Sequence, residues 1–113
     1  MVISTIRLFP PRDQRRHLLA VLRSVQGPTQ AQPRCKECRI YEEDGYDEAV
    51  LYLESWDSES DLERHVRSDL YQRVLAAIEL SRTLPEIQFH YVSETKGIEL
   101  VQALRKGEAQ GST

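Results

Sequence analysis

The sequence lacks the short motifs that identify many enzymes directly. It contains no G-x-x-x-x-G-K-[ST] phosphate loop, no G-x-G-x-x-G turn, no G-x-S-x-G nucleophile motif and no H-E-x-x-H zinc helix. These absences remove nucleotide-dependent and hydrolytic chemistry from the expected functions.

Long apolar segments are also missing. The opening stretch MVISTIRLFPP is short, contains Arg7 and ends at Pro10 and Pro11. We therefore expect neither a signal peptide nor a membrane-spanning helix. The default expectation is a cytoplasmic protein with no membrane partner, whose thiols stay reduced.

Cysteine is scarce, and the two thiols present form the pair Cys35-x-x-Cys38. This spacing occurs in redox and zinc sites, but residues three apart on a strand point to opposite faces. A structural zinc site would also need two further ligands at close spacing. We therefore expect structural or incidental thiols, with no metal bound by this pair.

Neither sign of charge dominates, since 15 Lys and Arg residues face 18 Asp and Glu residues, for a net charge of −3. The absence of a basic stripe with interleaved aromatic residues argues against nucleic acid as a partner. A chain of 113 residues suits one domain, assigned here to residues 1–105. The polar segment from Lys106 to Thr113 contains two glycines and is expected to be a disordered tail.

The spacing of apolar residues predicts an alternation of strands and helices. Strands are predicted where β-branched and aromatic residues cluster or alternate: Val2 to Phe9, Arg34 to Glu42, Glu48 to Trp56, and Glu86 to Val92. Helices are predicted where apolar residues recur every three or four positions: Arg12 to Val25, a long helix from Leu62 to Ile78 that is bent or broken near Arg67, and a short one through Ile98, Val101 and Leu104.

Three local signals mark ends and turns. The segment from Gln26 to Pro33 holds one glycine and two prolines and is predicted to be a loop. Asp44-Gly45 predicts a two-residue type I′ hairpin turn, in which both central residues need positive φ. Ser58, with Asp61 three residues later, forms a capping-box pattern that predicts the start of a helix.

The order β-α-β-β-α-β indicates an α+β, ferredoxin-like fold: a four-stranded antiparallel sheet with the helices on one face. The other face is left uncovered. We expect Val50, Tyr52 and Trp56 to lie on that uncovered face. Because an apolar face of this size is rarely left in water, we expect a homodimer through the sheet face.

Several motifs together resemble the antibiotic biosynthesis monooxygenase (ABM) family. They are Glu54-Ser55-Trp56-x-Ser58, His65-x-x-Ser68, Tyr71 and Pro85-x-Ile87-x-Phe89, and the resemblance extends from about Val2 to Leu104. It implies a ferredoxin-like domain that forms a dimeric α/β barrel. The family is functionally mixed.

The resemblance implies several activities. Some members oxygenate polycyclic phenols or quinones with no metal or organic cofactor, some degrade haem, and others act on quinols or have no assigned reaction. Haem degraders of the family use an Asn on the first strand and a Trp and a His ten residues apart on the second helix. Here the first strand has no Asn, and His65 and Leu75 stand at the other two positions, which argues against haem degradation; haem binding through His65 stays open.

His65 is the candidate proton-handling residue. A histidine titrates near neutral pH and can accept the proton of a phenol, which leaves an electron-rich anion for reaction with O2. Tyr71 lies further along the same predicted helix and is the second catalytic candidate. The alternative for His65 is a structural role at the helix bend, through Ser68.

The candidate substrate-binding residues are Trp56, Tyr52 and Glu54. A flat indole wall suits a planar ring, although packing in the core or the dimer interface is the more common role for such a tryptophan. Glu54 would have a raised pKa if buried without a partner; the alternative is an ion pair with Arg39 on the adjoining strand.

Two functions of different classes follow. The first is a cofactor-independent monooxygenase acting on a planar aromatic, phenolic or quinoid small molecule. The second is a non-catalytic dimeric module of the same fold that binds a small ligand or regulates. A roomy pocket lined by His65 and aromatic side chains would favour the first.

Overall fold

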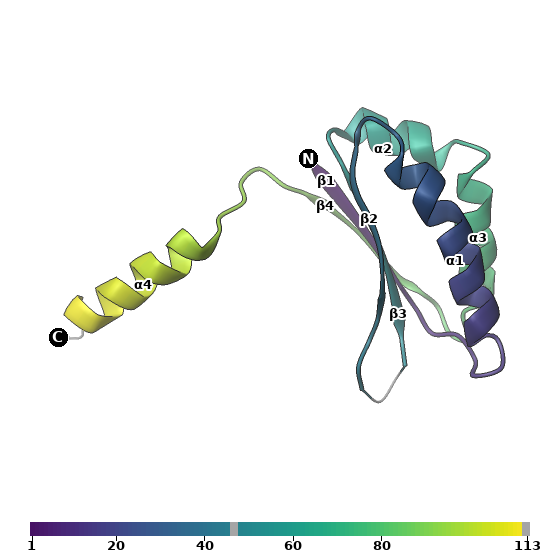
Figure 1. Ribbon diagram of the computed structural model, residues 1–113, viewed down its shortest axis with the longest axis horizontal. Coiled ribbons are helices and arrows are strands. Elements are labelled where there is room, and N and C mark those ends of the chain that lie inside the picture. Colours follow the sequence, from purple (N-terminus) through teal and green to yellow (C-terminus); the bar gives the residue numbers. More distant parts are fainter. Residues whose placement is uncertain (46–47, 112–113) are drawn as a thin grey trace.

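The computed structural model describes residues 1–45 and 48–111 of the chain. Its elements are β1 (Val2–Leu8), α1 (Arg15–Gln30), β2 (Cys35–Glu42), β3 (Val50–Trp56), α2 (Glu59–Val66), α3 (Tyr71–Glu79), β4 (Glu86–Tyr91) and α4 (Ile98–Gly111). The strands form one antiparallel sheet in the order β2-β3-β1-β4. The helices α1, α2 and α3 lie on one side of this sheet (Figure 1). The predicted ferredoxin-like fold is therefore confirmed.

The core lies between the sheet and α1 with α3. Leu18, Leu22 and Val25 on α1 are fully buried, as are Ile6 on β1 and Val74 on α3. Fully burying a side chain of this kind contributes about 1.5–3 kcal/mol. These contacts hold α1 and α3 on the sheet.

The prediction for the uncovered sheet face was wrong. Val2 pairs with Trp56, Ile6 with Tyr52 and Leu8 with Val50. Directly paired residues share one face, and all of these side chains are at most 1% exposed. Val50, Tyr52 and Trp56 therefore face the helices. The period-2 pattern groups them correctly but does not reveal which face the helices cover.

The helix α1 continues through the predicted loop as far as Gln30. It contains Gly27 and Pro28, which we expected to end it. Proline removes one backbone donor inside a helix, and this leaves the carbonyl of Ser24, four residues earlier, without its helical partner. The guanidinium of Arg73 on α3 donates to this carbonyl at 3.4 Å, so a tertiary contact compensates for the loss.

The hairpin between β2 and β3 is present, but its turn is longer than predicted. Glu42 pairs with Val50, and the amide of Glu43 donates to the carbonyl of Ala49 at 2.8 Å. The connection therefore spans residues 43–49, of which 46 and 47 lie outside the described residues. Gly45 has φ +139°, a value that favours glycine.

The predicted break in the second long helix is confirmed. The helix α2 ends at Val66 and α3 begins at Tyr71. Ser58 caps α2 as predicted, accepting a hydrogen bond from the amide of Asp61 at 3.3 Å. The hydroxyl of Ser68 donates to the carbonyl of His65 at 2.6 Å, which ties the bend to the end of α2.

The C-terminal segment differs from the predicted tail. The helix α4 extends past Lys106 to Gly111, while residues 112 and 113 lie outside the described residues. Alanine, leucine, arginine and lysine between residues 103 and 106 favour a helix and offset the cost of Gly107. No helix in the described part of the chain is long and apolar enough to cross a membrane.

Candidate functional site

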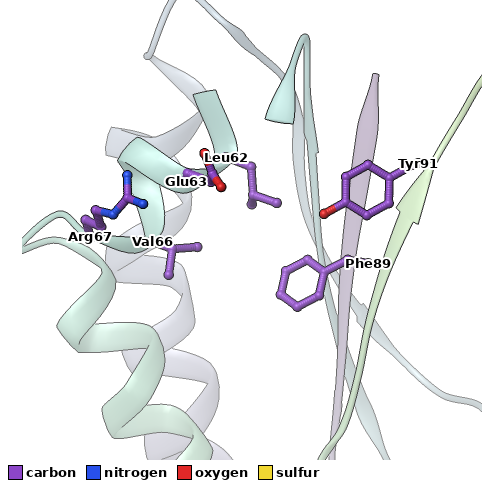
Figure 2. Close-up of a pocket in the computed structure, with 6 residues that line it drawn as sticks. All are labelled: Leu62, Glu63, Val66, Arg67, Phe89 and Tyr91. Atoms are coloured by element: carbon purple, nitrogen blue, oxygen red, sulfur yellow. The ribbon is translucent and has the colours of Figure 1, made fainter. Parts of the chain in front are cut away.

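An apolar cleft lies between α2 and β4 (Figure 2). Leu62 and Val66 form its helix side, and Phe89 and Tyr91 form its strand side. Glu63 and Arg67 complete the lining, and the cleft volume is about 230 Å³. Phe89 is 44% and Tyr91 64% exposed, so two aromatic rings are available to a ligand.

The strand pairing explains how the cleft forms. Phe89 pairs with Ser4 and Tyr91 with Val2, so both rings stand on the helix-covered face of an edge strand. Across from them α2 begins at its Ser58 cap and ends at the bend before α3. The apolar side of α2 therefore faces two aromatic rings across a gap. The Tyr91 hydroxyl is oriented by a 3.3 Å hydrogen bond to Glu59.

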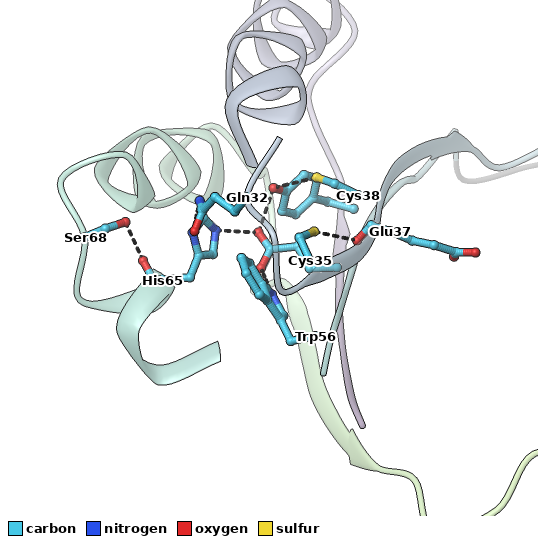
Figure 3. A network of polar contacts seen from close by, with 9 residues as sticks. Gln32, Cys35, Glu37, Cys38, Trp56, His65 and Ser68 are labelled. Carbon is cyan, nitrogen blue, oxygen red and sulfur yellow. Dashed lines mark hydrogen bonds and ion pairs between the residues drawn. The ribbon is translucent and has the colours of Figure 1, made fainter. Parts of the chain in front are cut away.

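A second, fully buried cluster surrounds Glu54 on β3; two of its members, Trp56 and His65, are labelled in Figure 3. The Glu54 carboxylate is 1% exposed and accepts hydrogen bonds from the Tyr52 hydroxyl at 2.7 Å and from the Trp56 indole N–H at 2.9 Å. His65 Nε2 lies 3.0 Å from the same carboxylate. Buried charges in proteins are paired and hydrogen-bonded, and Glu54 meets this requirement through three partners.

His65 has a polar neighbour at each ring nitrogen and two aromatic rings beside it. Its Nδ1 lies 3.4 Å from Nε2 of the Gln32 side-chain amide. With that amide as donor, Nδ1 accepts and Nε2 carries the hydrogen given to Glu54. The Trp56 ring is 4.8 Å away and tilted, and the Tyr71 ring meets it edge-on at 5.3 Å. The imidazole is therefore fixed in position.

The tyrosine and cysteine groups around Glu54 are kept protonated. Burial first, and then the charge of Glu54, raise the pKa of Tyr71 to about 12, and the same causes in the same order raise the pKa of Tyr52. Burial raises the pKa of Cys38 to about 12 and that of Cys35 to about 11. The thiols are therefore poor nucleophiles and poor metal ligands at neutral pH.

The geometry of the cysteine pair corrects one expectation. A bulge between Cys35 and Glu37 shifts the register, so that Cys35 pairs with Trp56 and Cys38 with Glu54. Both cysteines therefore stand on the helix-covered face, where an uninterrupted strand would place them on opposite faces. Cys38 donates to the Tyr52 hydroxyl at 3.2 Å. Among the described residues no group of three or more potential ligands could hold a metal ion.

The five predicted site residues are brought together, but away from the cleft. His65, Tyr71, Trp56, Tyr52 and Glu54 are all at most 6% exposed, and none of them lines the cleft. Leu62 connects the two places, because it lines the cleft and packs against Trp56.

The expected Glu54–Arg39 pair does not form, since Arg39 pairs with Leu53 on the opposite sheet face. The cleft lining was missed by sequence reasoning. Its signal was the alternation of Ile87, Phe89 and Tyr91 beside the apolar side of α2.

Comparison with solved structures shows the same fold in other organisms. Rv0793 from Mycobacterium tuberculosis is 23% identical with a TM-score of 0.76, covering 85% of this chain and 98% of that one. A proposed antibiotic biosynthesis monooxygenase from Deinococcus radiodurans is 23% identical with a TM-score of 0.77, covering 87% and 98%. A conserved protein from Methanosarcina mazei is 21% identical with a TM-score of 0.72, covering 80% and 91%.

Comparison of the sequence with family models identifies the family of the chain. No curated protein matches it. The family model described as "Antibiotic biosynthesis monooxygenase" matches residues 1–77, which run from β1 into α3 and include the buried Glu54–His65 pair. This match spans more than half of the 113 residues, and the chain therefore belongs to the antibiotic biosynthesis monooxygenase family.

Proposed function

We propose that this protein is a cofactor-independent monooxygenase that binds a planar phenolic or quinoid molecule in the cleft between α2 and β4. The observation that carries the proposal is the pair of exposed aromatic rings, Phe89 and Tyr91, facing the apolar side of α2. Aromatic walls stack on planar rings. The family match and the structural relatives named as monooxygenases support the reaction type.

The reaction needs no external reductant. A phenol that loses its proton can pass electrons to O2, and one oxygen atom is then inserted at a ring C–H. The other oxygen leaves as water with the two hydrogens of the substrate, so a phenol and O2 yield a quinone and H2O. Arg67 at the cleft supplies positive charge for the phenolate, because an opposite charge favours the ionised form.

His65 and Tyr71 are proposed to handle the proton. His65 contacts the Tyr71 ring edge, and the described residues offer no hydrogen-bond partner to the Tyr71 hydroxyl, which leaves it able to donate. In this proposal the ligand reaches the pair by displacing Leu62, behind which Trp56, Tyr52 and Glu54 would then form the inner wall. This displacement is a necessary part of the mechanism, because His65 is 1% exposed.

The alternative function is a ligand-binding or regulatory module. It is favoured by one observation: the hydrogen-bonding groups of His65 and Glu54 are already satisfied by protein partners. A histidine in this state stabilises the fold without doing chemistry. The two functions share the cleft and differ in whether the ligand reacts.

Oxygen consumption distinguishes the two functions. We expect O2 uptake with hydroxylated naphthalenes or anthrones, lost in Phe89→Ala and retained in the matched control Gln88→Ala on the opposite face of β4. His65→Gln should abolish uptake while the chain stays folded. If a naphthoquinone quenches the fluorescence of Trp56, the only tryptophan, but no phenol in the panel consumes O2, the binding module replaces the oxygenase.

We also propose that the protein is a homodimer through its uncovered sheet face, in the cytoplasm. Proteins of this family are generally dimeric. The uncovered face carries Ile3, Leu51 and Leu53, all partly exposed, and has two hollows of about 260 and 300 Å³. The two free thiols are consistent with a reducing compartment.

A further inference from the structure

The helix α4 stands apart from the rest of the domain. It projects beyond the sheet on the side opposite to α1, α2 and α3 (Figure 1). Ile98, Val101 and Leu104 are 67%, 50% and 64% exposed. Their spacing of three residues puts them along one side of the helix, and Leu100 widens this side. We call these four residues the α4 stripe.

An exposed apolar stripe of this kind requires a partner. Glu99, Gln102 and Lys106 lie on the other side of α4, so the helix is amphipathic in the way of a helix packed on one face. An isolated helix of 14 residues is marginal in water without such packing. Within the described residues, the domain's own helices lie on the far side of the sheet and do not cover the stripe.

We propose that the α4 stripe packs against a second copy of this chain, as an exchanged arm that completes the dimer. The uncovered sheet face and α4 lie on the same side of the molecule (Figure 1). Any copy seated on that face therefore comes next to α4. The six residues between β4 and α4 can span about 20 Å when extended, which is enough to reach a neighbour.

The sheet face alone is too small for a standard dimer interface, which supports an exchanged arm. Four strands about 4.8 Å apart and about seven residues long at roughly 3.3 Å per residue present a face of about 450 Å². Standard stable interfaces bury about 800 Å² on each partner. A helix of 14 residues is about 21 Å long and about 10 Å wide. Each copy would bury its own α4 on the partner and would be covered by the partner's α4. Together these two contacts add about 400 Å² of buried area per copy, which raises the area of the sheet face to that of a standard interface.

The proposal goes beyond the proposed function and rests only on its dimer part. The arm lies outside residues 1–77, which carry the family match. In this proposal α4 stabilises the dimer, a role that the oxygenase chemistry does not need. Failure of the arm and failure of the oxygenase are therefore observed separately.

Dissociation of the full-length chain tests the arm. We expect Leu104→Asp to raise the dimer dissociation constant at least tenfold by sedimentation or light scattering. Gln102→Asp adds the same charge to the opposite side of α4 and should leave the constant unchanged. Equal dissociation constants for the two variants would overturn the arm and keep the sheet-face dimer. A wild-type chain that is monomeric at 100 μM would overturn both.

Amine cross-linking identifies which copy receives the arm. Lys106 is on α4, while Met1 and Lys36 line a hollow of the uncovered face. In a mixture of light and nitrogen-15-labelled chains, we expect cross-links from Lys106 to Lys36 or to the amino terminus that join one light and one heavy chain. Cross-links confined to single chains would show that α4 folds back on its own sheet, and would overturn the exchange.

Discussion

His65 Nε2 lies 3.0 Å from the carboxylate of Glu54, and both side chains are at most 1% exposed. This pair joins α2 to β3 inside the core. A buried pair is weak evidence for added stability, but removing one partner leaves the other uncompensated. The consequences of breaking the pair are therefore large and measurable.

Glu54→Gln should lower the free energy of unfolding by about 2–4 kcal/mol. The carboxylate accepts from Tyr52, Trp56 and His65, and the glutamine amide would turn N–H groups toward at least one of these donors. Urea unfolding measures the change. The control is Glu37→Gln on the exposed sheet face. A loss below about 0.5 kcal/mol, the range of ordinary surface substitutions, would show that the network tolerates a neutral side chain.

Alkaline pH should destabilise the protein through Tyr71. Its pKa is raised from 10 to about 12 in the folded chain, so the folded state holds the proton more tightly than the unfolded state. This stability is fully present below pH 10 and is lost as the pH rises through about 12, with a slope of up to about 1.4 kcal/mol per pH unit.

The measurement is urea unfolding at pH 8, 10 and 11. Tyr71→Phe should show a shallower decline above pH 10 than the wild type, because it removes one titrating group. Identical slopes for the two chains would place the alkaline sensitivity elsewhere, such as at Tyr52 or Cys38, whose pKa values burial also raises.

Filling the cleft should block ligand without unfolding the domain. Val66 is 39% exposed and lines the cleft opposite Phe89, so Val66→Trp can place its ring in the gap. Naphthoquinone affinity, measured by calorimetry because this variant adds a second tryptophan, should fall at least tenfold. Leu75→Trp on exposed α3 surface is the control. Unchanged affinity in Val66→Trp would move the binding site away from this cleft.

Two glycines should respond differently to alanine. Gly27 lies inside α1 and directly precedes Pro28. The gain in helix propensity is opposed by crowding between the new Cβ and the proline ring, so Gly27→Ala should change the stability by less than about 0.5 kcal/mol. Gly45 has φ +139°, so Gly45→Ala should destabilise by about 1 kcal/mol or more. Thermal melting of both variants tests the pair; equal shifts would contradict the assigned conformations.

The local elements could be predicted because their causes are local. The alternation in β1 and β3, the Ser58 cap and the break after Val66 each depend on residues within one or two turns of chain. The element order then restricts the fold to the ferredoxin-like plan. Gathering Trp56, His65 and Tyr71 as candidates also followed from sequence motifs.

Only the tertiary structure decided what these residues do. Alternation groups Tyr52, Glu54 and Trp56 on one face, but the position of the helices makes that face the core. The Glu54–His65 pair joins a strand to a helix. The cleft joins α2 to β4, two elements separated by the whole of α3. Sequence determined the scaffold and the sets of residues that share a face. Packing between distant segments decided which residues are buried and which ones line the cleft, because burial depends on tertiary partners that the periodicity of a single segment does not identify.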